Sequence, residues 1–562
     1  MKLRFKNWRT NIVLLLIIIF GAAIISRLFF LQILERKLFS AQALGQQVGF
    51  STVTGARGQI YCSGSGEVKS LAINKDSWTI SASLKDIPDK EVFAKTLSEN
   101  INQTKDQIIS EISSHDNYAV IEKDVSQEQA DKIKNLNLKG LSLEKATERY
   151  YPQGQFAPQV LGFLGGESSG QYGIEGYYDD VLKGKTGVQE EQTGFSSVFS
   201  SAGEASLDGS DIYLTIDYNI QLQAESLLRQ AKDNLDIESG QIIVLKPDTG
   251  KILAMANYPN FDLNQYSKES DLAIFQNSAV QKLFEPGSIM KPFTMASALN
   301  EGKITPETTY VDTGVVKFGT KTIHNYGNEV YGKQTMTGVL ENSINTGAIF
   351  AEQQMDHKLF FSYLDKFGFF EKTGIDLQGE VYSHNDLLKN GQDMEYATAS
   401  FGQGIELTPL QIARAFCALA NGGKLVKPYI VEKIVNGNDE SYTKPEISDP
   451  IVSKQTISQL IPMMINVIDG GLPRQKITGY YIAGKTGTAQ IPLTNSKGYD
   501  PNKTIQSFVG FAPALNPQFL ILVKLDNPRA SKSALSSVPV FRDLAQYIIN
   551  YWKIPPDYDI NK

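Results

Sequence analysis

Near the N-terminus, residues 10–26 contain no charged residue and are mostly aliphatic. A helix over this stretch is about 25 Å long, close to the ~30 Å hydrocarbon core of a bilayer. A buried helix of a soluble protein would have a polar face, and this stretch has none. A cleaved signal peptide would end its apolar run at small residues, whereas Ile24 and Ile25 continue the run beyond residues 21–23. The sequence therefore predicts an uncleaved membrane anchor.

Basic residues predict the orientation of this anchor. Four of them precede the apolar stretch, which favours a cytoplasmic N-terminus by the positive-inside rule. Most of the 562 residues would then lie outside the cytoplasm. The expected order is a cytoplasmic tail (1–10), a transmembrane anchor (11–31) and a linker helix (32–50).

Composition excludes several classes of protein. The length suggests more than one domain, and 41% hydrophobic with 20% charged residues is typical of a chain that forms cores. The net charge of −7 argues against a dedicated nucleic-acid binder, which needs excess lysine and arginine. Cys62, Cys417 and four scattered histidines provide no metal-ligand spacing, so we expect no metal and no cofactor.

The pattern of apolar residues along the sequence changes near residue 206. Residues 51–205 are mixed, with an alternating run at 78–82, a charged helical stretch at 126–135 and a glycine-rich segment at 162–176. The glycines indicate either a hinge between two domains or a string of turns inside one domain.

Residues 206–550 follow the pattern of an α+β domain, and residues 551–562 form a C-terminal tail. Helices are predicted over 220–234 and 538–552. Strands are predicted at 212–216, 241–245, 480–483, 508–511 and 519–523.

Three short motifs occur in this part in one order: Ser288-x-x-Lys291, Ser343-x-Asn345 and Lys485-Thr486-Gly487-Thr488. Residues three apart share a helix face, so the Lys291 amine can reach the Ser288 hydroxyl. A serine hydroxyl is a poor nucleophile until a base removes its proton, and no histidine is placed to do so. Lys291 can act as that base if burial and a second nearby cation keep it neutral.

Each motif alone is weak, because all three recur elsewhere in the chain. Context distinguishes the set: only Ser288 follows Phe284-Glu285-Pro286-Gly287, and only Lys485 follows a strand-like run. Residues 479–486 also satisfy G-x-x-x-x-G-K-T, but bulky strand-like residues replace the open loop that phosphate binding needs. The other copies begin at Ser142, Ser441, Ser98, Ser383, Lys185 and Lys372.

The sequence resembles the class B penicillin-binding proteins, the monofunctional D,D-transpeptidases of peptidoglycan synthesis. The match covers nearly the whole chain, although Tyr61-Cys62-Ser63 departs from the family's usual turn. The division-type branch is favoured by Thr373 to Leu377 and by the form of the third motif. Further matching blocks are Arg57–Ile60, Arg149–Pro152, Gly173–Gly176, Phe401–Gly404 and Ala420–Gly423.

The resemblance implies a pedestal or dimerisation-type domain over 51–205 and a transpeptidase domain over 206–550, with an antiparallel sheet flanked by helices. It implies that Ser288 attacks the bond between the last two D-alanines of a stem peptide, with Lys291 as base. Ser343 would relay a proton and Asn345 would hold the substrate amide. Lys485, Thr486, Gly487 and Thr488 would bind the terminal carboxylate, and β-lactams would acylate Ser288 as substrate mimics.

Two alternatives stay open at this stage. The same fold could serve a D,D-carboxypeptidase or penicillin-hydrolysing enzyme, or a β-lactam-acylated sensor or scaffold without turnover. The resemblance also implies a single-pass protein of the inner membrane whose catalytic domain is extracytoplasmic. Because the chain has no recognisable glycosyltransferase domain, its expected partners include a multi-span glycan polymerase and other division or elongation proteins.

Overall fold

The computed structural model describes residues 8–29, 50–166, 168–190, 207–493 and 498–559. The chain separates into two compact units. The smaller unit consists of residues 1–58 and 180–210, and the larger of residues 59–179 and 211–562.

The smaller unit contains the N-terminal helix α1 and a two-stranded antiparallel ladder of β1 and β8. Over the described residues, no helix combines the length and apolarity that a membrane crossing requires, so the predicted anchor stays a prediction. The predicted linker helix over 32–50 lies almost wholly outside the described residues, and Phe50, its last residue, belongs to β1. The bounds are α1 (Trp8–Phe29), β1 (Phe50–Thr54) and β8 (Thr186–Glu190).

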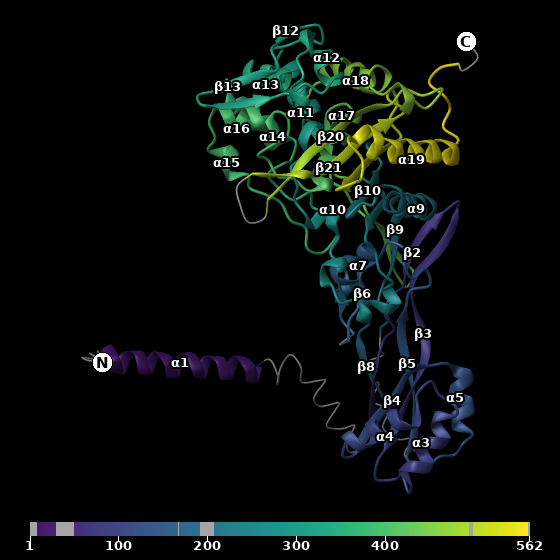
Figure 1. Cartoon of the computed structure of the whole chain (residues 1–562). Coiled ribbons are helices and arrows are strands. Elements are labelled where there is room, and N and C mark those ends of the chain that lie inside the picture. Colours follow the sequence, from purple (N-terminus) through teal and green to yellow (C-terminus); the bar gives the residue numbers. More distant parts are fainter. Residues whose placement is uncertain (1–7, 30–49, 167, 191–206, 494–497, 560–562) are drawn as a thin grey trace. The chain divides into compact units, whose positions relative to one another are not determined.

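The first part of the larger unit is built on one long strand, β3, which pairs with β2, β4 and β5 (Figure 1). Three short helices pack on this ladder, and each begins at a side chain that caps its first amide groups: Asp89, Thr104 and Ser126. The predicted strand at 78–82 and the predicted helix at 126–135 are confirmed as parts of β3 and α5. The bounds are β2 (Ile60–Gly64), β3 (Glu67–Ser83), α3 (Lys90–Ser98), α4 (Lys105–Ser114), β4 (Tyr118–Val125), α5 (Gln127–Lys134) and β5 (Leu141–Tyr150).

The glycine-rich segment forms turns and short elements inside the larger unit, which is the second of the two alternatives given above. It brings two of the matching blocks together, because the Arg149 guanidinium donates to the Glu175 carboxylate at 2.7 Å with both side chains buried. The elements are α6 (Pro158–Leu161), β6 (Phe163–Leu164), β7 (Gly170–Gln171) and α7 (Gly173–Tyr177), and α8 (Asp179–Leu182) follows at the boundary between the two units.

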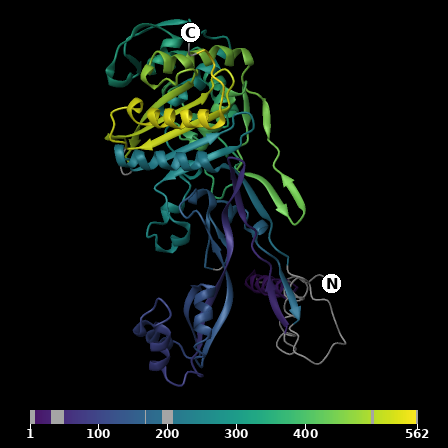
Figure 2. The ribbon, with the colours of Figure 1, turned by 90° about the vertical axis from the view of Figure 1, so that its right-hand side faces the viewer.

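A five-stranded antiparallel sheet, in the order β11-β10-β22-β21-β20, forms the centre of the larger unit. Helices α9 and α19 contact each other and pack on the sheet, where the yellow α19 is seen in front of the strands in Figure 2. Helix α17 contacts β10, β21 and β22. Apolar residues of the strands, α9 and α19 form one fully buried cluster, which confirms the predicted antiparallel sheet with flanking helices. The bounds are β9 (Asp211–Asp217), α9 (Tyr218–Leu235), β10 (Ser239–Leu245), β11 (Ile252–Tyr258), α17 (Pro409–Ala420), β20 (Ala483–Pro492), β21 (Tyr499–Ala512), β22 (Phe519–Asp526) and α19 (Ser537–Trp552).

The strand predicted over 480–483 is wrong except for its last residue, because β20 begins at Ala483. The reason is tertiary. The Tyr481 amide donates to the carboxylate of Asp557, and the Tyr481 carbonyl accepts from Ala514, so its backbone groups are used outside the ladder. The strand instead continues through the third motif to Pro492.

Candidate active site

The first motif lies where a 3-10 turn, η4 (Gly287–Met290), leads into the helix α11 (Lys291–Asn300). Gly287 has a φ of +60°, and its amide donates to the carbonyl of Gly402 at 2.9 Å. Gly402 itself has a φ of +83°, which favours glycine. Two segments far apart in sequence therefore fix the turn that carries Ser288.

Lys291 is completely buried, and its amine is surrounded by oxygen atoms. The Nζ atom lies 3.0 Å from the hydroxyl of Ser288 and 3.2 Å from that of Ser343. It also donates to the Ser343 carbonyl at 2.5 Å and to the side-chain oxygen of Asn345 at 2.8 Å. Burial, followed by repulsion from Lys485, holds the pKa of Lys291 well below its usual value.

The second motif is held by the start of the helix α13 (Asn345–Gln353), which lies close to the strand β14 (Lys321–His324). Ser343, just before the helix, adopts a left-handed φ of +57°, a strained conformation of the kind that recurs at functional sites. The side-chain nitrogen of Asn345 (Nδ2) donates to the His324 carbonyl at 3.1 Å, so the side-chain oxygen faces Lys291. Asn345 is therefore part of the cluster and does more than begin a helix.

Lys485 projects from β20, the edge strand of the central sheet, and is completely buried. Its amine donates to the hydroxyls of Ser343 at 3.0 Å and Thr486 at 3.1 Å. Burial lowers the pKa of Lys485 to about 7. Ser343 thus has one lysine on each side, and the two amines can repel each other across it.

The remainder of the third motif continues along β20. A Cβ atom at Gly487 would lie 2.4 Å from the Ser507 hydroxyl and 3.0 Å from the Pro286 carbonyl, so glycine permits close contact between β20 and the Ser288 turn. The Thr488 hydroxyl lies 3.0 Å from that of Ser533, which also donates to the Gly487 carbonyl. Ser533 belongs to no motif, and nothing in the sequence singles it out.

The structure brings five predicted residues into direct contact: Ser288, Lys291, Ser343, Asn345 and Lys485. Thr486, Gly487 and Thr488 follow Lys485 on the strand β20. Two of the repeated motifs, by contrast, begin at Ser142 on β5 and Ser441 on β18 (Asp439–Tyr442). The nucleotide-loop pattern ends inside β20, where no helix follows.

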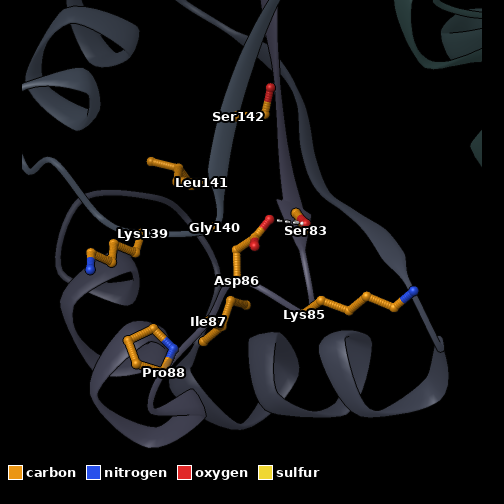
Figure 3. A pocket seen from close by; sticks show the side chains of 9 residues that line it. All are labelled: Ser83, Lys85, Asp86, Ile87, Pro88, Lys139, Gly140, Leu141 and Ser142. Atoms are coloured by element: carbon orange, nitrogen blue, oxygen red, sulfur yellow. Dashed lines mark hydrogen bonds between the residues drawn. The ribbon is translucent and has the colours of Figure 1, made fainter.

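Among the described residues, no group of three or more potential metal ligands is present. A surface pocket of about 620 Å³ lies instead in the first part of the larger unit, between the ends of β3 and β5 (Figure 3). Lys85 and Lys139 line it, and the Ser83 hydroxyl donates to Asp86 at 2.6 Å. The lining includes Ser142, where a repeated copy of the first motif begins, but no residue of the cluster around Lys291 and Lys485.

Comparison with known proteins gives matches along most of the chain. Residues 240–546 match the penicillin binding protein transpeptidase domain, and residues 52–214 match the penicillin-binding protein dimerisation domain. Stage V sporulation protein D of Bacillus subtilis is 32% identical over 477 residues, covering 82% of this chain and 73% of that protein. Peptidoglycan D,D-transpeptidase FtsI of Escherichia coli is 28% identical over 569 residues, covering 98% of this chain and 93% of that protein.

Solved structures match over a similar extent. Penicillin binding protein 3 of Mycobacterium tuberculosis, solved with ampicillin, is 25% identical with a TM-score of 0.70. The match covers 91% of this chain and 98% of that one.

Proposed function

Because this chain belongs to the penicillin-binding protein transpeptidase family, as its motifs predicted, we propose that it is a peptidoglycan D,D-transpeptidase that works through an acyl-enzyme on Ser288. The similarity to a peptidoglycan D,D-transpeptidase, FtsI of Escherichia coli, supports this activity. The arrangement of the three motifs supports the role of each residue.

One observation carries the proposal: the surroundings of the Lys291 amine fit a base. A neutral amine has two hydrogens and one lone pair. The Ser343 carbonyl and the Asn345 amide oxygen can only accept, so they take both hydrogens. The lone pair is then left for a hydroxyl, and the Ser288 oxygen lies 3.0 Å away. Burial, followed by repulsion from Lys485, lowers the pKa of Lys291 and so favours this neutral form.

In the proposed acylation, the Ser288 oxygen attacks the carbonyl carbon between the last two D-alanines, and its proton passes to Lys291. The peptide C–N bond then breaks. The leaving nitrogen receives a proton through the Ser343 hydroxyl, which lies within 3.2 Å of both lysine amines. D-alanine departs and the remaining peptide stays on Ser288 as an ester. An amine of a second stem peptide attacks this ester, which restores the serine and creates the cross-link.

The third motif is proposed to bind the charged parts of the substrate. Lys485 in its cationic form, with the hydroxyls of Thr486 and Thr488, would hold the terminal carboxylate. Backbone amides of Ser288 and Thr488 would stabilise the oxyanion, a contribution typically of about 3–4 kcal/mol. β-Lactams would open their ring on Ser288 in the same way and remain attached.

Intact-protein mass spectrometry after treatment with benzylpenicillin tests the proposal. We expect one adduct, mapped by peptide to Ser288, and none in Ser288→Ala. Lys291→Arg should also acylate very slowly, because a guanidinium does not give up its proton. An adduct at full rate in either variant would contradict the proposed roles. Incubation with stem-peptide substrates then separates the activities: cross-linked dimers support transfer, whereas free D-alanine without dimers indicates a carboxypeptidase.

We propose further that α1 anchors the chain in the inner membrane, with the N-terminus cytoplasmic and the catalytic domain outside. The charge-free sequence supports this, as does the exposure of apolar side chains such as Leu16 (59%) and Phe20 (69%). We also propose a role at the division septum beside a multi-span glycan polymerase, as the resemblance of the sequence to the division-type branch implies. Membrane fractionation of the full chain and of a chain lacking residues 1–31 tests the anchor, since only the former should sediment with membranes.

A further inference from the structure

A buried carboxylate outside the three motifs lies at the centre of a hydrogen-bond network next to the second motif. Asp312, the last residue of β12 (Thr309–Asp312), is only 2% exposed. One of its oxygens accepts from the Thr346 hydroxyl at 2.6 Å and from the Gly314 amide at 3.0 Å. The other accepts from the Asn325 side chain at 3.0 Å and from the Tyr331 amide at 2.8 Å.

This network reaches the residue that follows Asn345. The side-chain nitrogen of Asn325 donates to Asp312 and to the Glu329 carbonyl, which leaves its oxygen to accept from the Thr346 amide at 3.1 Å. Two consecutive residues, His324 and Asn325, thereby hold two consecutive residues, Asn345 and Thr346, at the start of α13. Asp312 accepts hydrogen bonds from both Asn325 and Thr346 and so fixes the contact between these two residues.

Given the proposed function, we infer that Asp312 is a positioning residue for the transpeptidase reaction: it sets the place of Asn345 through Asn325 and Thr346. The hydrogen bonds of Asp312 go to Gly314, Asn325, Tyr331 and Thr346, so it acts through the start of α13 and not on Ser288 or Lys291 directly. All four of its partners donate, so an ionised carboxylate suits the site and a carboxamide would turn two hydrogens toward donors. The Asp312→Asn substitution should therefore displace the start of α13.

The chain offers a matched control in Glu380, another buried carboxylate of the same unit. It is 8% exposed and accepts from the Thr373 amide, the Thr373 hydroxyl and the Gly374 amide, at 2.7, 2.5 and 3.1 Å. None of these residues contacts the three motifs in the hydrogen bonds described above. Glu380→Gln thus disturbs a comparable set of hydrogen bonds to a buried carboxylate, at a turn outside the site.

The experiment measures the second-order rate constant for acylation of the full chain in detergent by a fluorescent penicillin, as a function of pH. We expect Asp312→Asn to lower it about 100-fold, because a displacement of about 1 Å near reacting groups has such effects. Glu380→Gln should change it less than about threefold. Melting temperatures of both variants report any general loss of folding.

The pH profile separates positioning from simple destabilisation. The Asn345 oxygen accepts from Lys291, and such a bond favours the ammonium form, so its loss should move the acid limb of the profile about one unit lower. Lys485, the charged group that faces Lys291, is held by Ser343 and Thr486 and keeps its influence in the variant. A smaller pair of variants repeats the test: Thr346→Val should slow acylation about tenfold, and Thr346→Ser, which keeps the hydroxyl, should restore it.

The outcomes distinguish this inference from the proposed function. If the unsubstituted chain forms no adduct at Ser288, the proposed function is wrong. If it acylates normally while Asp312→Asn and Glu380→Gln slow acylation equally with an unmoved acid limb, the positioning role of Asp312 is overturned. Equal rates for Thr346→Val and Thr346→Ser would overturn it as well.

Discussion

Replacement of Lys485 by methionine should move the acid limb of the acylation profile upward by about two pH units. The two lysine amines cannot be more than about 6 Å apart, because they lie 3.2 and 3.0 Å from the same Ser343 hydroxyl. At that separation and an effective dielectric constant of about 20, two unit charges repel by about 3 kcal/mol. This corresponds to about two pKa units.

The direction of the shift follows because the Lys485 cation disfavours the charged form of Lys291. Burial is the larger cause of the lowered pKa of Lys291 and remains in the variant, because methionine also excludes water. Repulsion by Lys485 is the second cause and disappears. The pKa of Lys291 therefore rises, and a higher pH is needed to obtain the neutral base.

The assay is the rate constant for acylation by a fluorescent penicillin, measured between pH 5 and pH 10 on the unsubstituted chain, Lys485→Met and Lys485→Arg. The arginine variant keeps the cation, so its acid limb should stay in place. Its alkaline limb should disappear, whereas the unsubstituted chain loses the cation above the Lys485 pKa of about 7. An unmoved acid limb in Lys485→Met, or the same shift in Lys485→Arg, would refute the electrostatic coupling.

Three further substitutions test other parts of the structure. Gly402→Ala should lower penicillin acylation at least tenfold at pH 7, because a Cβ would lie 2.2 Å from the Gly287 carbonyl at a φ of +83°; an unchanged rate would contradict this. Burial raises the pKa of Glu225 to about 7, so its contribution to stability is present below its unfolded pKa and is lost as the pH rises through 7. Glu225→Gln should therefore raise the melting temperature more at pH 8 than at pH 5. An equal change at both pH values would count against the assignment. Glu175→Ala should cost about 3–5 kcal/mol by leaving the buried Arg149 without its carboxylate partner, measured by urea unfolding, and a loss below 1 kcal/mol would show that the pair is dispensable.

The sequence was most informative where local rules apply. Helical periodicity located α9 and α19, and the charged helical stretch at 126–135 located α5. The spacing of Ser288 and Lys291 placed the two side chains within reach because both belong to one turn of the chain. Local patterns failed at 480–482, where the backbone bonds to the distant residues Asp557 and Ala514.

Copies of the same motifs show why a local pattern alone cannot define a site. Ser441 and Lys444 have the spacing of the first motif, yet Ser441 is exposed on β18. Ser288 differs because Gly402 holds its turn, and because β20 and the start of α13 bring Lys485 and Asn345 to the same place. Burial then changes the chemistry of the lysines, a property that depends on the residues packed around them.

The sequence by itself determined the family, the three motifs and the pairing of a serine with a lysine one turn away, since these depend on residues close together in the chain. Only the tertiary structure decided that Lys291 and Lys485 lie on either side of Ser343, and that Asp312 supports Asn345 through Asn325 and Thr346. Those contacts join residues from 13 to 142 positions apart. No periodicity or spacing encodes such separations, because they are set by how strands and helices pack.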